Sequence, residues 1–192
     1  MGNIMKKITI ALAAVVAACA TPAFAEAPSG VRTEVLVGWD RVSLDLNDLG
    51  LGTYSEDGVG FGLALGYDIP TTGNVAFGVD AEVSDSSTKY VYDDGVDRAV
   101  ISTGRDLYVG ARVTAAVNPK LNLYGKVGYT NARIKGELNG FKDGENGDGV
   151  RLGLGAQLGL GGNSYGLLEY RYSNYESNFS RNQVLAGVGL RF

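Results

Sequence analysis

Apolar and polar residues alternate with a period of two along most of this chain, and this alternation restricts the fold more than any other feature. In residues 58–68, every second side chain is large and apolar, from Val59 and Phe61 to Tyr67, while the residues between them are glycine, Ala64 or Asp68. Such alternation over eight or more residues is typical of β-strands that bury one face in an apolar environment.

Seven further segments show the same alternation, so we predict eight strands. They cover residues 31–41, 58–68, 75–84, 105–117, 121–132, 148–160, 166–173 and 182–192. Each is close to the length of roughly 9–11 residues that a tilted strand needs to cross a membrane.

The connections between these segments alternate between long and short. The long ones cover residues 42–57, 85–104, 133–147 and 174–181, and the short ones carry the turn residues Pro70, Gly73, Pro119 and Gly162. Strict alternation places all long connections at one end of the sheet and both termini at the other. The sequence therefore predicts an all-β fold, an eight-stranded antiparallel up-and-down transmembrane β-barrel with its long loops outside the cell.

The face opposite the large apolar residues is rich in glycine and in charges of both signs. The chain has 29 glycines, many of them on this face, and the narrow lumen of an eight-stranded barrel requires small residues. A soluble periplasmic carrier with its apolar face inward is the alternative interpretation. Of the charged residues, six have inward parity and lie away from strand ends, so we predict a lumen charge network of Glu82, Arg112, Lys126, Arg151, Glu169 and Arg171.

Aromatic residues on the apolar face lie near the strand ends, as expected for two membrane–water interfaces. Trp39, Phe61, Tyr129 and Tyr172 lie toward the long loops. Tyr67, Phe77 and Phe192 lie toward the short turns. We therefore predict two aromatic girdles.

The first 25 residues have the pattern of a cleavable signal peptide. Lys6 and Lys7 precede an apolar run over residues 8–20, and Ala23-Phe24-Ala25 is an A-x-A cleavage site. We expect residues 1–25 to be removed and residues 26–192 to form the barrel domain. Cleavage would leave 15 basic and 21 acidic residues, a formal charge of −6, and no cysteine. Cleavage before a lipidated Cys19 is the alternative.

Composition argues against several functions. The chain contains no histidine, which removes the usual general base and His-ligated zinc, so we predict no enzymatic activity, cofactor or metal site. An acidic chain offers nucleic acid no electrostatic attraction. Acidic residues cluster in 93–97 and 143–148. We interpret both clusters as solvated loops, with Ca²⁺ binding as the alternative.

Three stretches carry a resemblance to a known family: Leu107-Tyr108-Val109-Gly110-Ala111-Arg112, Leu123-Tyr124-Gly125-Lys126-Val127-Gly128-Tyr129 and Leu168-Glu169-Tyr170-Arg171-Tyr172. The chain resembles the small eight-stranded outer-membrane β-barrels of Gram-negative bacteria, which include OmpA- and OmpX-type barrels, opacity-type surface proteins and porin-like relatives. The resemblance implies a monomer in the outer membrane that contacts its lipids and lipopolysaccharide. It also implies insertion by the barrel-assembly machinery after escort by periplasmic chaperones.

The last strand resembles the assembly signal of that family. Gly187, Leu190 and Phe192 occupy the expected positions, while Leu185 stands where a polar residue is usual. The resemblance implies that this strand is read during insertion.

The function that these features favour is structural, with display of acidic loops at the cell surface. Three alternatives stay open at this point: an adhesin or receptor that acts through the long external loops, a narrow pore for small ions, and the soluble periplasmic carrier.

Overall fold

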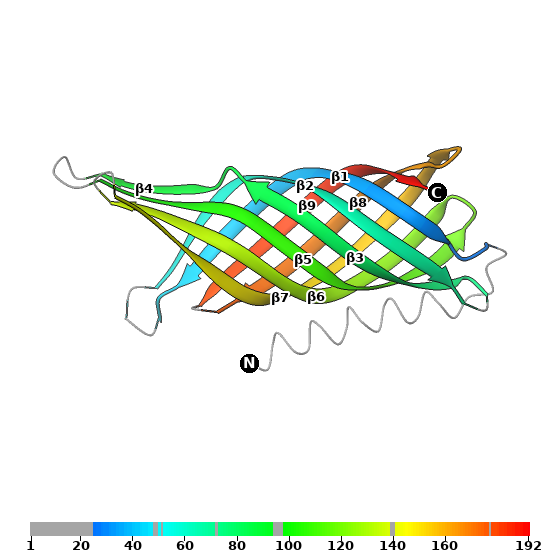
Figure 1. Ribbon diagram of the computed structural model, residues 1–192, viewed down its shortest axis with the longest axis horizontal. Helices are drawn as coiled ribbons and strands as arrows, with labels where there is room; N and C mark the ends of the chain where they lie inside the picture. The colour runs from blue at the N-terminus through cyan, green and yellow to red at the C-terminus, as the bar shows by residue number, and fades with distance from the viewer. Residues whose placement is uncertain are drawn as a thin grey trace.

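The computed structural model describes residues 25–47, 50, 52–71, 73–93, 98–138, 141–176 and 178–192. Within these residues the chain forms a single twisted sheet of nine strands (Figure 1). Among the described residues, no helix is both long enough and apolar enough to cross a membrane. The predicted signal peptide, apart from Ala25, lies outside the described residues.

The strands follow one another along the chain with short connections in the described part. Their bounds are β1 Gly30–Asp45, β2 Thr53–Pro70, β3 Val75–Ser86, β4 Lys89–Asp93, β5 Arg98–Asn118, β6 Leu121–Leu138, β7 Phe141–Gly161, β8 Ser164–Tyr175 and β9 Phe179–Arg191.

Eight of these strands close into a ring. Strand β1 pairs with both β2 and β9, and β3 pairs with β5 instead of β4. All pairings are antiparallel, and β4 is attached only to the edge of β5 outside the ring. The prediction of an eight-stranded antiparallel up-and-down barrel is thus confirmed, with β4 as an additional short strand within the predicted second long loop.

The register places the apolar face on the outside of the barrel. Val35 lies opposite Leu63, and these side chains are 55% and 57% exposed on the outer wall. The next pair along, Glu34 and Ala64, is buried inside. This orientation is opposite to that of a soluble barrel that encloses a ligand against apolar side chains, so the soluble-carrier alternative is set aside.

The strands next to the long connections are longer than the sequence predicted. The prediction of a loop over residues 133–147 is wrong for most of this range, because β6 and β7 pair up to Leu138 and Phe141. The two residues between them in the sequence are Asn139 and Gly140, and an Asn-Gly pair is a strong hairpin signal. The alternation of large apolar residues ends near Tyr129 because the strands continue beyond the apolar band into a polar region.

Strands β4, β5, β6 and β7 extend beyond the rest of the barrel as a projecting sheet, at the left of Figure 1. Strand β8 ends at Tyr175, which lies opposite Gly149 on β7. In the described part of the chain, residues 141–147 of β7 therefore pair only with β6. Their other edge is free, at the end of the barrel opposite to the chain's C-terminus.

The outward assignment can be tested by placing a charge at the centre of the apolar band. Replacement of Leu63 by Arg is expected to cost about 2–4 kcal/mol in the free energy of unfolding from lipid vesicles, because the guanidinium would lie near the bilayer midplane. Ile69→Arg is the depth control, since Ile69 is equally exposed but near the short-turn end, where the expected cost falls to about 0–1 kcal/mol. Equal stability of Leu63→Arg and the parent would show that Leu63 does not face lipid.

Candidate functional site

The interior of the barrel is lined by charged residues of both signs. We call the following set the lumen network: Arg32, Glu34, Asp40, Asp68, Asp80, Glu82, Asp106, Arg112, Lys126, Arg151, Glu169, Arg171, Arg181 and Arg191. Every member except Arg191 is fully or nearly buried, and each forms at least one ion pair with another member. The set holds seven carboxylates and seven cations, so its formal charge is zero.

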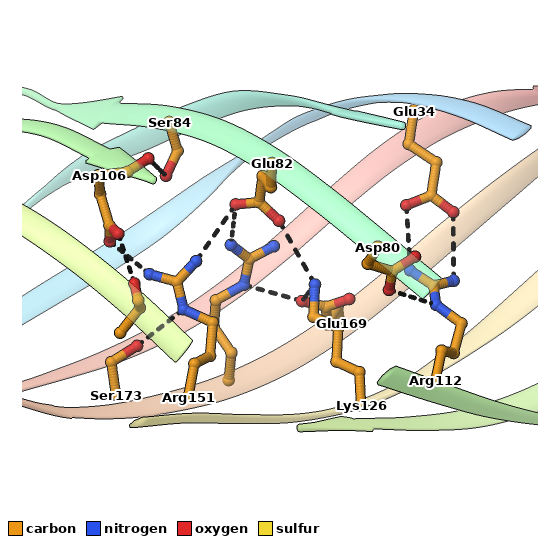
Figure 2. A network of polar contacts seen from close by, with 12 residues as sticks. Glu34, Asp80, Glu82, Ser84, Asp106, Arg112, Lys126, Arg151, Glu169 and Ser173 are labelled. Atoms are coloured by element: carbon orange, nitrogen blue, oxygen red, sulfur yellow. Dashed lines mark hydrogen bonds and ion pairs between the residues drawn. The ribbon is translucent and has the colours of Figure 1, made fainter. Parts of the chain in front are cut away.

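The centre of the lumen network is built around two glutamates (Figure 2). The ammonium group of Lys126 lies 2.8 Å from Oε1 of Glu169 and 3.4 Å from Oε2 of Glu82. The guanidinium of Arg171 contacts both carboxylates as well, with Nε 2.8 Å from Oε1 of Glu169. Arg151 reaches Glu82 at 3.5 Å. Each glutamate therefore faces at least two cations.

Toward the projecting sheet, Asp106 is the centre of a second group. Its carboxylate pairs with Arg151 and, at 2.9 Å, with Arg181. It also accepts hydrogen bonds from the hydroxyls of Thr130 at 2.6 Å and Tyr175 at 2.7 Å. Arg181 in turn holds Asp40 through two hydrogen bonds of 2.7 and 2.8 Å. This group lies across the lumen on the side of the long connections.

Toward the short turns, Glu34 and Asp80 hold a third group. Nε of Arg112 lies 2.8 Å from Asp80, and its Nη atoms lie 3.3 Å from Glu34. Arg32 pairs with Asp80 and, at 3.0 Å, with Asp68. Arg191 completes the group at 3.1 Å from Asp68.

Five of the six predicted lumen residues are in direct contact. Glu82, Lys126, Arg151, Glu169 and Arg171 form one cluster, whereas Arg112 pairs with Glu34 and Asp80 and has no direct ion pair with the other five. Tyr124 joins the two groups. Its hydroxyl donates to Glu169 at 2.8 Å, and the Arg112 guanidinium lies 4.1 Å from its ring centroid.

Eight members of the lumen network are not among the six predicted residues. They are Arg32, Glu34, Asp40, Asp68, Asp80, Asp106, Arg181 and Arg191. For the three of these on β1, Arg32, Glu34 and Asp40, the alternation already carried the signal, since Val31, Val35 and Trp39 point outward and the even-numbered residues of the strand must point inward.

Glycines of the inner face make room for flat side chains. A Cβ at Gly155 would lie 2.4 Å from the ring of Tyr124, and one at Gly189 would lie 2.4 Å from the ring of Tyr165. At Gly66, a Cβ would lie 2.4 Å from the guanidinium carbon of Arg32. The glycine content therefore follows from the need to stack large polar side chains inside a narrow barrel.

An acidic groove of about 290 Å³ lies where the projecting sheet leaves the barrel. Apolar side chains contribute to its floor, including Ala132, Ile134 and Phe179. Carboxylate residues also line it: Asp143, Glu145 and Glu176.

The second acidic cluster of the sequence does not gather into one site. Asp143 and Glu145 have inward parity on β7, while Asp148 points outward and accepts hydrogen bonds from Tyr129 and Asn131. Among the residues that the structure describes, no group of three or more His, Cys, Asp or Glu side chains is placed to hold a metal ion. Residues 94–97 of the first cluster lie outside the described part.

The predicted girdle residues all lie on the outer wall. Trp39, Phe61, Tyr67, Phe77, Tyr129 and Phe192 are exposed there, and Tyr172 is half-buried. In the last strand, Leu190 and Phe192 also point outward, while a Cβ at Gly187 would come within 2.4 Å of the Val35 carbonyl oxygen. The roles of these residues at the interface and in assembly stay predictions.

Because the charges of the lumen network are balanced, we expect the loss of one charge to destabilise the barrel more than the loss of an oppositely charged pair. Glu169→Ala should cost about 3–5 kcal/mol in unfolding free energy, because Lys126 and Arg171 would face Glu82 alone in a dry interior. Glu169→Leu combined with Lys126→Leu removes one charge of each sign, and Glu82 keeps Arg151 and Arg171. We expect the double variant to be the more stable of the two in urea titrations from lipid vesicles. A double variant at least as unstable as the single one would argue against charge balance as the stabilising feature.

Comparison with known proteins agrees with this architecture. The crystal structure of Ail from Yersinia pestis superposes with a TM-score of 0.58 at 17% identity, covering 85% of this chain and 99% of Ail. Neisserial surface protein A gives a TM-score of 0.61 at 18% identity, with 85% and 98% covered. The N-terminal barrel of OprF from Pseudomonas aeruginosa gives 0.50 at 12% identity, with 83% and 97% covered. At such identities these likenesses show the fold alone.

Sequence comparison identifies the family directly. No curated protein matches the chain, but the model of the outer membrane protein beta-barrel domain matches residues 10–192. This match covers nearly the whole sequence, and the outward apolar wall and closed ring are the features that such a domain requires. The chain is an integral outer-membrane protein that crosses the membrane with its strands, and it belongs to the outer membrane protein beta-barrel domain family.

Proposed function

We propose that this protein acts as a closed, structural barrel that displays its projecting sheet at the cell surface. The observation that carries the proposal is the lumen network, which fills the barrel with paired charges from Asp40 at one end to Arg191 at the other. A barrel of eight strands has an interior just wide enough for side chains. An interior filled by paired charges supports a plug, and it disfavours the narrow pore.

An adhesin or receptor is the second candidate, and the projecting sheet favours it. The free edge of β7 over residues 141–147 offers unpaired backbone groups to an extended peptide. The acidic groove beside it combines an apolar floor at Ile134 and Phe179 with the carboxylates of Asp143 and Glu145. This combination suits an extended partner segment that carries basic and apolar residues.

The proposal includes no enzymatic activity. The chain has no histidine to serve as a general base, and the buried carboxylates of the lumen are engaged by arginine and lysine. We further propose a monomer that contacts outer-membrane lipids and lipopolysaccharide, is delivered by periplasmic chaperones and inserted by the barrel-assembly machinery, and binds no nucleic acid.

Conductance distinguishes the plug from the pore. The refolded chain, reconstituted in planar bilayers, is expected to give no stable channel steps, because ions would have to displace paired charges along the whole lumen. A large porin inserted under the same conditions provides the positive control. Reproducible steps from the wild-type chain, absent after thermal unfolding, would replace the structural proposal with the pore.

Surface display can be tested by labelling intact cells. A cysteine at Asn146 on the projecting sheet should react with a membrane-impermeant maleimide, and a cysteine at Lys120 in a short turn should react only after lysis. Both positions are exposed in the barrel, so accessibility depends on the side of the membrane alone. The reverse labelling pattern would place the projecting sheet in the periplasm and end the display proposal.

A further inference from the structure

Basic side chains outside the lumen network are concentrated in one place. Among the described side chains, Lys89, Arg105, Arg133 and Lys135 all lie on the outer wall of the projecting sheet. The other two outside the network are Arg41, near Trp39, and Lys120, in a short turn. We call the group of four the outer basic cluster. Its concentration stands out because the mature chain is acidic.

The strand register brings the four cations together. Ser102 on β5 pairs with Lys89 on one side and with Lys135 on the other, which puts both lysines on the same face. Arg133 lies two residues nearer the barrel on β6. Opposite it, β5 has a bulge between Thr103 and Asp106 that contains Arg105. The cluster thus covers three adjacent strands.

The cluster lies directly beyond the apolar band. Arg105 lies two residues before the exposed Leu107 on β5, and Arg133 lies four residues after the exposed Tyr129 on β6, so both lie on the long-connection side of the apolar band. A strand rises about 3.3 Å per residue and is tilted by roughly 40°. The backbone positions of Arg105 and Arg133 therefore lie about 5–10 Å beyond the apolar boundary, at the depth of lipid headgroups.

None of the four cations forms an ion pair with another described residue, in contrast to Arg41, which is held by Asp57 at 2.8 Å. Of the carboxylates whose side chains the structure describes, the two nearest in register have other partners. Asp148 accepts hydrogen bonds from Tyr129 and Asn131. Asp85 accepts one from the backbone N–H of Ser86. The described carboxylates therefore leave the positive charge of the cluster unpaired.

Two glycines give the long side chains space to lie along the wall. A Cβ at Gly144 would come within 3.1 Å of Nε of Arg133, and a Cβ at Gly104 would come within 2.9 Å of Cε of Lys135. The side chains are thus held over neighbouring strands of the outer wall.

We propose that the outer basic cluster binds the phosphate groups of lipopolysaccharide in the outer leaflet. Guanidinium and ammonium groups are the donors that phosphate prefers, and their position just beyond an aromatic and aliphatic wall matches a phosphorylated headgroup whose acyl chains pack below it. A soluble polyanion would gain nothing from that wall. The inference depends on the outward orientation of the projecting sheet, and it is independent of whether the barrel is a plug, a pore or a receptor.

The test compares two variants that each lose two positive charges. Arg133→Gln with Lys135→Gln removes half of the cluster, and Arg41→Gln with Lys120→Gln removes two exposed cations elsewhere. Both are refolded as the mature chain into phosphatidylcholine nanodiscs, and folding is checked by heat-modifiable gel mobility. Binding of bisphosphorylated lipid A, of dephosphorylated lipid A and of a soluble polysulfate is then measured by native mass spectrometry.

We expect the cluster variant to bind bisphosphorylated lipid A roughly 30-fold more weakly than the parent, since each cation near such a surface contributes about fivefold in affinity. The Arg41/Lys120 variant should bind like the parent, and dephosphorylated lipid A should bind weakly to all three proteins. The inference is overturned if both variants bind lipid A equally, if removal of the phosphates has no effect, or if only the soluble polysulfate distinguishes the cluster variant. If labelling places residue 146 in the periplasm while the cluster variant still loses lipid A binding, the proposed orientation of the barrel is wrong, but the cluster is still a binding site for lipid A phosphates.

Discussion

The rest of the structure depends on the pairing of charges inside a barrel too narrow to hydrate them. An isolated charge in such an interior carries a desolvation penalty of several kcal/mol, which only opposite charges and hydrogen bonds offset. The lumen network meets this requirement with seven carboxylates and seven cations. Its large planar groups in turn require glycine on the facing strands, as at Gly66 beside Arg32 and Gly155 beside Tyr124. The high glycine content and the packing of the interior thus both follow from the need to pair charges inside a narrow barrel.

Neutrality of the interior means that the acidic surplus of the chain, which has 21 acidic and 17 basic residues, lies outside the lumen network. On the projecting sheet, four of the described charged side chains differ in face according to their sign. Arg133 and Lys135 point to the membrane side, while Asp143 and Glu145 have the opposite parity and line the acidic groove. One face thus suits an anionic leaflet and the other a cationic partner. A strand can carry both because successive side chains point in opposite directions.

The sequence predicted the ring of strands, the outward apolar wall and the inward charges, because these depend only on a period of two that repeats over every strand. It did not predict the projecting sheet, since strands that extend into water lose the large apolar residues that mark them. The Asn139-Gly140 pair was the available signal for the hairpin. The sequence also could not predict which charged residues pair with one another. Whether Arg112 contacts Glu82 or Glu34 depends on the stagger between distant strands, which no local pattern records.

If the lumen arginines are fixed and shielded from water, their side-chain nitrogen NMR signals will show it directly. In nanodiscs, Arg112, Arg151 and Arg171 should each give separate, slowly exchanging guanidinium signals, because all three are fully buried and each donates at least two hydrogen bonds to carboxylates. Arg41, whose side chain is 47% exposed, is the internal reference and should exchange rapidly with water. Fast exchange and averaged signals from Arg151 and Arg171, like those of Arg41, would contradict the account and indicate an open, hydrated lumen.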